Sequence, residues 1–327
     1  MQPIRKFDNG QVTYVFNDEE IRSELEDYHI RKVQLEACVD QRVEADLKDR
    51  VSDLVRVAKN GCDNVLMNAE ISDHEVKGTF GKGSDTSGPD AISAKLIDGA
   101  DRVLMHQSLK LIWNKAWIEG NFPSEWKRED RILIAKVGKD DYNDCHSYRT
   151  VSVRFEHITS QRLIGVLKEC HFDCDQFAYL KNRSATQAVL VVTENIKKAL
   201  IEGHMAAAVF FDFTDAFGSV NRNRLLLKLA NDFGISGRLL RHLESFLNDR
   251  FVRIKYDDSI GDWIQSFFGT SAFTSLGPLL FIVQVHDVPK CIKPKFADDL
   301  VAVSVGSDIQ IKSNQMMFIS DNSVHIN

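Results

Sequence analysis

Three aspartates at two distant places in the chain are the residues best suited to chemistry. Asp212 lies at the end of the apolar run 205–213, and Asp298 and Asp299 lie together inside "KFADDLVAV" at 295–303. Burying an ionised carboxylate without a partner costs several kcal/mol, and no lysine or arginine follows within seven residues of the pair. Either the pair lies at an exposed turn, or a metal ion supplies the missing positive charge.

Oxygen ligands without a neighbouring histidine or cysteine suit a hard ion, Mg²⁺ or Mn²⁺. If the two segments are neighbouring strands, their carboxylates converge, and a cation between them relieves the repulsion. Two such ions about 4 Å apart promote in-line phosphoryl transfer. The pattern therefore favours nucleotidyl transfer or phosphodiester cleavage, with an ordinary Asp-Asp turn as the alternative.

The elements that position these aspartates mix strands and helices. Successive side chains of a strand point to opposite faces, so we expect a tight hairpin that directs Asp298 toward Asp212 and leaves Asp299 near the rim. Between them, periodicity predicts a strand at 205–213, helices at 221–235 and 236–250, and strands at 251–258 and 263–269, followed by an apolar segment at 276–285. This irregular order favours an α+β fold.

Upstream of residue 205 the chain is largely helical in pattern. We expect one long amphipathic helix or a pair at 18–60, helices at 91–120 and 183–203, a strand at 131–137, and a Gly/Ser/Thr-rich linker at 78–88. The "GTFGKG" in that linker lacks phosphate-loop spacing. "CHFDC" at 170–174 lacks a second ligand pair for zinc.

Composition limits the classes of protein that need considering. The chain has 327 residues, 43% of them apolar, and no apolar run long enough to span a bilayer. The N-terminus shows no secretory signal and the six cysteines are scattered, so we expect an intracellular protein in a reducing compartment, nucleus or cytoplasm. A net charge of −6 argues against non-specific coating of nucleic acid, although basic residues outnumber acidic ones in the middle third.

Several short motifs occur in the order found in one protein family. They are "SGPDAI" (87–92), "GNFPSEWK" (120–127), "YRTVSV" (148–153), "QFAYLKNRSATQA" (176–188), "FFDFTDAFGSVN" (210–221), "LGPLLF" (276–281) and "FADD" (296–299). This collinear set resembles the reverse transcriptase domain of non-LTR (LINE-type) retrotransposons, over roughly residues 70–305. The resemblance implies a right-hand polymerase fold with fingers and palm, the palm being an antiparallel sheet backed by helices.

The resemblance also implies a division of the chain. We expect an acidic helical N-terminal extension at 1–78, a fingers-like region at 79–204, a palm with the catalytic aspartates at 205–305, and a truncated tail at 306–327. On this view the thumb is largely absent.

Site residues follow from the matched positions. Asp212 and Asp298 match the two metal-binding aspartates, and Asp299 matches the third acidic residue. Phe213 matches a residue whose carbonyl joins the metal shell, and Phe217 matches the aromatic gate that excludes a ribose 2′-OH. Three basic positions match residues of the fingers that hold the incoming triphosphate: Arg149, Lys136 and Arg183.

The resemblance implies an RNA-directed DNA polymerase, a nucleotidyltransferase that uses Mg²⁺ or Mn²⁺ and acts on an RNA template, a DNA primer and dNTPs. No protein partner and no membrane are indicated. The motif that ends in "LGPLLF" reads "GTSAFTSLGPLLF" over residues 269–281 and is called the third motif below. It departs from the family pattern, because Ala272 replaces a glutamine and Phe273 replaces a glycine. Gly218, Thr150, Ala178, Leu180 and Asn182 also depart from it.

These departures leave alternatives open. The chain is either a working polymerase domain, which is truncated or degenerate, or a catalytically inactive relic of one. A metal-dependent nuclease and a helical interaction module are the remaining alternatives.

Overall fold

The computed structural model of the chain describes most of its length. The described residues are 4–8, 11–33, 40–60, 65–80, 94–135, 148–151, 156–169, 172–213, 215–256, 259–270, 274–289 and 292–306. Lys136, Ala272, Phe273, the tail after residue 306 and most of the expected linker lie outside them.

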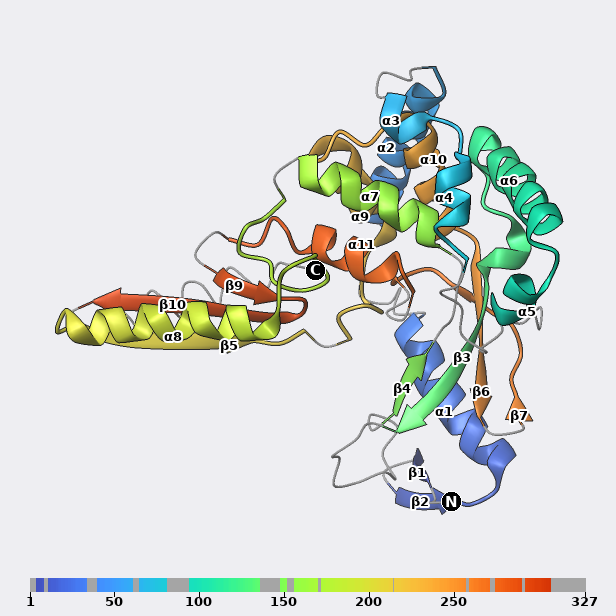
Figure 1. Cartoon of the computed structure of the whole chain (residues 1–327). Coiled ribbons are helices and arrows are strands. Elements are labelled where there is room, and N and C mark those ends of the chain that lie inside the picture. The colour runs from blue at the N-terminus through green and yellow to red at the C-terminus, as the bar shows by residue number, and fades with distance from the viewer. Residues whose placement is uncertain are drawn as a thin grey trace.

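One three-stranded antiparallel sheet brings the two acidic segments together (Figure 1). Its strands, in spatial order, are β5 (Met205–Phe211), β10 (Asp299–Gly306) and β9 (Ile292–Phe296). The register places Leu300 opposite Phe211, so β5 leads directly into Asp212 where β10 begins. Helix α8 (Ala185–Ile201) lies along this sheet and contacts all three strands. We call this unit the palm sheet.

A second, five-stranded sheet is mixed. Its strands are β4 (Tyr148–Val151), β3 (Arg128–Ala135), β6 (Arg250–Tyr256), β7 (Ser259–Ile260) and β8 (Ile264–Ser266). β3 and β6 run parallel, and the other pairs are antiparallel. Helix α1 (Asp18–Val33) packs against β6 and β7, and the hairpin of β1 (Ile4–Asp8) and β2 (Gln11–Val15) lies at its N-terminal end.

The remaining helices gather on one side of both sheets (Figure 1). They are α2 (Gln41–Asn60), α3 (Val65–Asn68), α4 (Asp73–Lys77), α5 (Ala94–Gly99), α6 (Arg102–Glu119), the short 3₁₀ helix η2 (Ser124–Lys127), α7 (His157–Glu169), α9 (Arg222–Asn231), α10 (Gly237–Leu247) and α11 (Gly277–Gln284). α9 and α10 bury leucines at helical spacing, whereas α11 is buried on every side. α2 packs against α9 and α10, so its stripe of Leu47, Val51 and Ala58 belongs to the same apolar core as these two helices.

The α+β class expected from the sequence is confirmed, and the antiparallel palm sheet is backed by helices. The helix expected at 91–120 is divided into α5 and α6, because the Asp101 carboxylate accepts hydrogen bonds from the N–H groups of Val103 and Leu104 and starts a new helix. The segment 18–60 likewise forms two helices. The division into extension, fingers, palm and tail stays a prediction.

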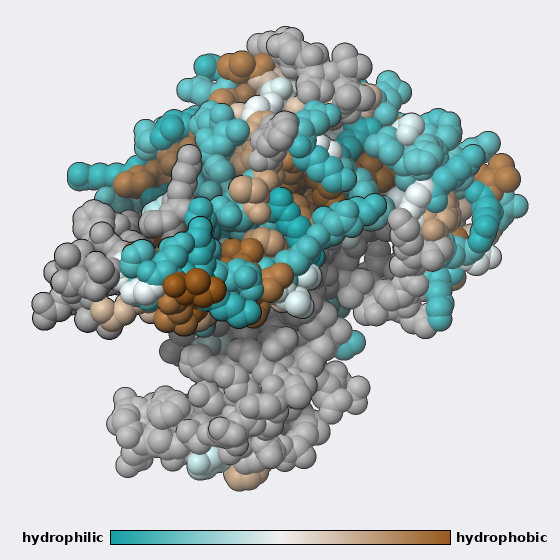
Figure 2. Space-filling view, turned by 60° about the vertical axis from the view of Figure 1, so that its left-hand side comes forward, coloured by the Kyte–Doolittle hydropathy of each residue, from teal (hydrophilic) through white to brown (hydrophobic). Residues whose placement is uncertain are grey.

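On the face that Figure 2 shows, the described surface is mostly hydrophilic. Figure 2 turns the α8 side of the molecule forward and shows apolar residues confined to a few patches. The end of α8 and the start of β5 contribute exposed Leu200, Ile201 and Met205. In the part of the chain that the structure describes, no helix combines the length and apolarity needed to cross a membrane.

Candidate active site

The three predicted catalytic aspartates lie at the same end of the palm sheet. Asp212 follows the last residue of β5, Asp298 lies in the turn between β9 and β10, and Asp299 is the first residue of β10. Asp298 is half-buried, whereas Asp212 and Asp299 are exposed. The hairpin therefore distinguishes the two adjacent aspartates, as expected from the alternation of side chains along a strand.

The carboxylates are close enough to perturb one another. Burial raises the pKa of Asp298 above its ordinary value, and the charges of Asp299 and Asp212 raise it further, against a lowering by a backbone hydrogen bond. Within the described residues, no ion pair joins any of the three to a lysine or arginine. Hard oxygen donors that lack a positive partner are chemically suited to Mg²⁺ or Mn²⁺, although ligand atoms from the three aspartates do not all lie within 4.8 Å of one another. The residues present thus fit the implied metal.

Aromatic rings form one wall beside the aspartates. The ring of Phe217 packs on that of Phe281 with 4.7 Å between centroids, and Tyr179 meets Phe217 edge-on at 6.4 Å. Phe213 also contacts Phe281, at 6.3 Å and nearly perpendicular. Burial raises the pKa of the Tyr179 hydroxyl, as does the charge of Asp298, so this ring extends from Phe217 toward the carboxylates.

The loop that carries Phe217 is bonded to the start of the third motif. The N–H of Thr270 donates to the carbonyl of Phe217 at 2.8 Å, and the N–H of Gly269 donates to the carbonyl of Val220 at 2.8 Å. Gly269 has φ +82°, and a Cβ there would lie 2.8 Å from the carbonyl oxygen of Gly218. Only glycine fits this close approach of two backbones.

Arg222 is hydrogen-bonded to residues 266–269, which lead into the third motif. Its buried guanidinium donates to the carbonyls of Ser266, Phe268 (2.7 Å) and Gly269 (2.9 Å), and to the Ser266 hydroxyl at 2.8 Å. These bonds satisfy backbone acceptors that would otherwise be buried without a donor. Arg222 is not recognisable as a functional residue from the sequence pattern, and its position just after "FGSVN" is the one signal that points to it.

Two of the three predicted basic residues lie in the described part of the chain, on segments other than those of the aspartates. Arg149 lies on β4, in the five-stranded sheet, with its backbone paired opposite Ile134. Arg183 lies before α8, where its guanidinium donates to the carbonyls of Asp173 (2.6 Å) and Gln176 and lies over the ring of Phe177. These contacts close a loop, and a triphosphate-binding role for Arg183 stays a prediction.

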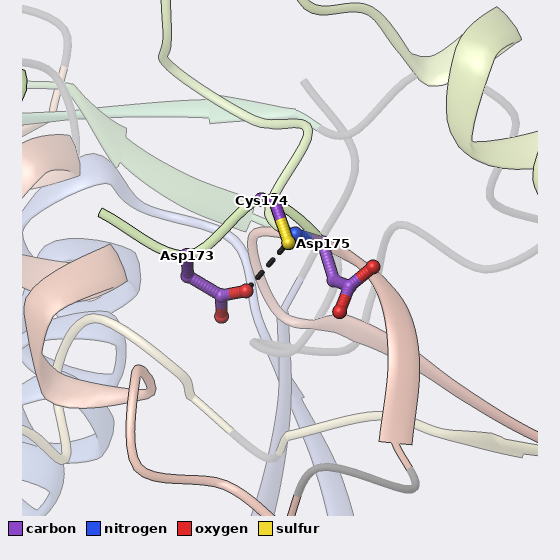
Figure 3. A group of neighbouring side chains, drawn as sticks. All are labelled: Asp173, Cys174 and Asp175. Atoms are coloured by element: carbon purple, nitrogen blue, oxygen red, sulfur yellow. Dashed lines mark hydrogen bonds between the residues drawn. The ribbon is translucent and has the colours of Figure 1, made fainter. Parts of the chain in front are cut away.

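That loop contains a second group of potential metal ligands, Asp173, Cys174 and Asp175 (Figure 3). One ligand atom from each lies within 4.8 Å of the others. The Asp173 carboxylate, however, accepts a hydrogen bond from the N–H of Asp175 at 3.0 Å and pairs with the ammonium group of Lys295. Because its charge is already neutralised, Asp173 serves to attach the loop to β9.

Comparisons with known proteins agree with these sequence motifs. No protein-family model matches the chain. A probable RNA-directed DNA polymerase from transposon BS of Drosophila melanogaster is 28% identical over 212 residues, which are 59% of this chain and 23% of that protein. The corresponding protein from transposon X-element of the same organism is 26% identical over 199 residues, 55% of this chain and 21% of that protein. The chain thus spans less than a quarter of the length of these two relatives.

Solved structures with a similar arrangement include two telomerases. Apo telomerase from Candida tropicalis superposes with a TM-score of 0.44 at 12% identity, covering 67% of this chain and 46% of that one. Telomerase from Candida albicans in complex with a telomeric RNA fragment superposes with a TM-score of 0.44 at 13% identity, covering 68% of this chain and 44% of that one. By the identity to the transposon proteins and the order of its own motifs, this chain is similar to the reverse transcriptase domains of non-LTR retrotransposons.

Proposed function

We propose that the chain contains the fingers and palm of an RNA-directed DNA polymerase of a retrotransposon. The observation that carries the proposal is that Asp212 and Asp298, from segments far apart in sequence, lie at the same end of the palm sheet, close enough for the charge of Asp212 to act on Asp298. The proposed reaction is attack by a primer 3′-hydroxyl on the α-phosphate of a dNTP, with pyrophosphate leaving and RNA as the template.

Each site residue has a proposed task. The carboxylates of Asp212, Asp298 and Asp299 and the carbonyl of Phe213 would hold Mg²⁺ or Mn²⁺, which supplies positive charge to the phosphates when bound. The ring of Phe217, which packs against the ring of Phe281, is proposed to exclude the 2′-hydroxyl of a ribonucleotide. The triphosphate is proposed to contact basic residues of the fingers region, Arg149, Lys136 and Arg183.

Primer extension tests the proposal directly. The substrates are oligo(dT) annealed to poly(rA) and dTTP, with Mg²⁺ or Mn²⁺. The full chain is compared with Asp298→Asn and with a control, Asp287→Asn, which removes an exposed carboxylate paired with Lys228. We expect Asp298→Asn to lose at least about 100-fold in rate and the control to keep its activity. Equal incorporation by all three proteins would refute the assignment.

An inactive descendant of such a domain is the second candidate, favoured by the replacements in the third motif. A phenyl ring at position 273, where the family has glycine, would obstruct close approach of template and nucleotide. The double change Ala272→Gln and Phe273→Gly should then create activity in a chain that has none. No gain would show that these two replacements are not the cause.

A further inference from the structure

We infer that Gln176 is a positioning residue for Asp298, an inference that rests on the function proposed above. Gln176 is 1% exposed and lies before α8. Its side-chain oxygen accepts a hydrogen bond from the N–H of Ala297 at 3.1 Å, and a second from the N–H of Ala178 at 2.9 Å. Ala297 is the residue immediately before Asp298, so the amide oxygen acts on the turn that carries the carboxylate.

The turn requires such support because its backbone is unfavourable. Ala297 has φ +56°, in the left-handed region that costs an L-residue about 1–2 kcal/mol. Ala297 is also 3% exposed, so its N–H needs an acceptor from within the protein. By accepting that hydrogen bond, Gln176 stabilises the left-handed backbone conformation of Ala297, and with it the turn in which Asp298 lies.

The segment around Gln176 is itself firmly attached to β9. The N–H of Phe177 donates to the carbonyl of Lys295 at 2.8 Å, and the N–H of Lys295 donates to the carbonyl of Asp175 at 2.8 Å. The buried ammonium group of Lys295 pairs with Asp173. These bonds make residues 175–177 a short parallel addition to the palm sheet, so Gln176 is held by a rigid base.

The same side-chain oxygen also acts on the aromatic wall. Ala178, its second donor, precedes Tyr179, which has φ +59° and meets Phe217 edge-on. One amide oxygen therefore supports both the acidic turn and the ring that backs the proposed nucleotide gate. The amide nitrogen of Gln176 has no partner within the described residues, so the oxygen is the atom that the role requires.

The matched variants are Gln176→Met, which removes the acceptor, and Gln284→Met, which removes a buried glutamine on α11 whose side-chain oxygen has no partner within the described residues. Hydrogen exchange of the amides at 297–300 is measured in the full chain. We expect Gln176→Met to speed exchange about tenfold, the effect of losing one hydrogen bond, and Gln284→Met to leave it unchanged. Equal exchange in both variants would overturn the inference.

Binding of Mn²⁺ alone, followed by electron paramagnetic resonance, is the second measurement. Gln176→Met should weaken binding several-fold, with Asp298→Ala as the reference for a lost ligand. In primer extension, Gln176→Met should lower kcat while the KM for primer–template stays unchanged, because the residues that would bind the nucleic acid are not altered. If Gln176→Met and Gln284→Met both lower kcat, Mn²⁺ affinity and the thermal midpoint to the same extent, the role of Gln176 is merely structural.

Failure of the proposed function would look different. If the unmodified chain neither polymerises nor binds Mn²⁺, the function fails, and exchange at 297–300 still decides whether Gln176 controls the turn. If Gln176→Met does not fold, Gln176→Glu retains an oxygen acceptor at the same place. If the amides at 297–300 of Gln176→Glu exchange about as fast as those of the unmodified chain, the inference is supported. If they exchange faster than those of Gln284→Met, it is contradicted.

Discussion

Replacing Glu129 by glutamine should destabilise the fold strongly. The Glu129 carboxylate lies between β3 and β6, where it pairs with Arg250 at 2.8 Å and approaches Arg131 at 3.5 Å. The side chains of Glu129 and Arg250 are 3% and 4% exposed. Burial lowers the pKa of nearby Arg222, as do the charges of Arg250 and Arg131, whereas Glu129 raises it. Glu129 is therefore the counter-charge for a cluster of arginines.

The size of the effect follows from this burial. Removing one partner of a buried ion pair leaves an uncompensated charge and costs about 3–5 kcal/mol. An unfolding entropy of about 2.1 cal/mol/K per residue over 327 residues gives about 0.7 kcal/mol/K, so the midpoint should fall by about 4–7 °C. Thermal unfolding followed by circular dichroism measures this shift.

Glu125→Gln is the matched control, because Glu125 pairs with Arg128 at 3.4 Å on the surface, where such pairs contribute about 0–1 kcal/mol. The double change Glu129→Leu and Arg250→Met should be less destabilised than Glu129→Gln, since the buried charge of Arg250 is removed together with its partner. If Glu129→Gln shifts the midpoint no more than Glu125→Gln does, the argument from buried charge is wrong.

Three further changes have definite expected outcomes. The pKa of Asp298 is raised in the folded state, so its ionisation destabilises the native state once the pH rises above the unfolded-state pKa of 3.8. In the absence of divalent ions, Asp298→Asn should therefore raise the thermal midpoint at pH 7. Well below pH 3.8 the same variant should leave the midpoint unchanged. Phe217→Val should lower the preference for dTTP over UTP in kcat/KM, whereas an unchanged ratio would exclude a gating role. Burial and the charge of Arg162 lower the pKa of His242 to about 4. Stability should therefore fall by about 3 kcal/mol as pH drops from 6.5 to 4, and His242→Phe should remove this slope in urea titrations.

The pattern of apolar residues along the chain predicted helices and strands well where it was unambiguous. The apolar run at 205–213 contains the strand β5, although its residues are half-buried or exposed rather than buried as its apolarity suggested. The leucine-rich segments are α9 and α10, because burial of one face leaves a clear helical period. The expected helix 91–120 was divided by Asp101, whose capping competes with helix continuation through a local hydrogen bond. The apolar segment 276–285, which length alone does not assign, is the helix α11.

The candidate site was predictable in part for the same reason. Asp212, Asp298 and Asp299 stand out because charges inside apolar runs require an explanation that is visible in the sequence. Gln176 and Arg222 do not stand out, because their roles depend on hydrogen bonds to backbone atoms distant in the chain. Arg183 was identified by its motif, but its contacts in the fold are carbonyls of its own loop.

The sequence by itself therefore determined the α+β class, most elements and the acidic residues, since these follow from periodicity and from the cost of burying charge. Only the tertiary structure decided the register that places Leu300 opposite Phe211, the hydrogen bond of Gln176 to the turn before Asp298, and the packing of α2 in the same apolar core as α9 and α10. Those facts depend on strand register and on packing between segments that lie far apart along the chain, which no local pattern encodes.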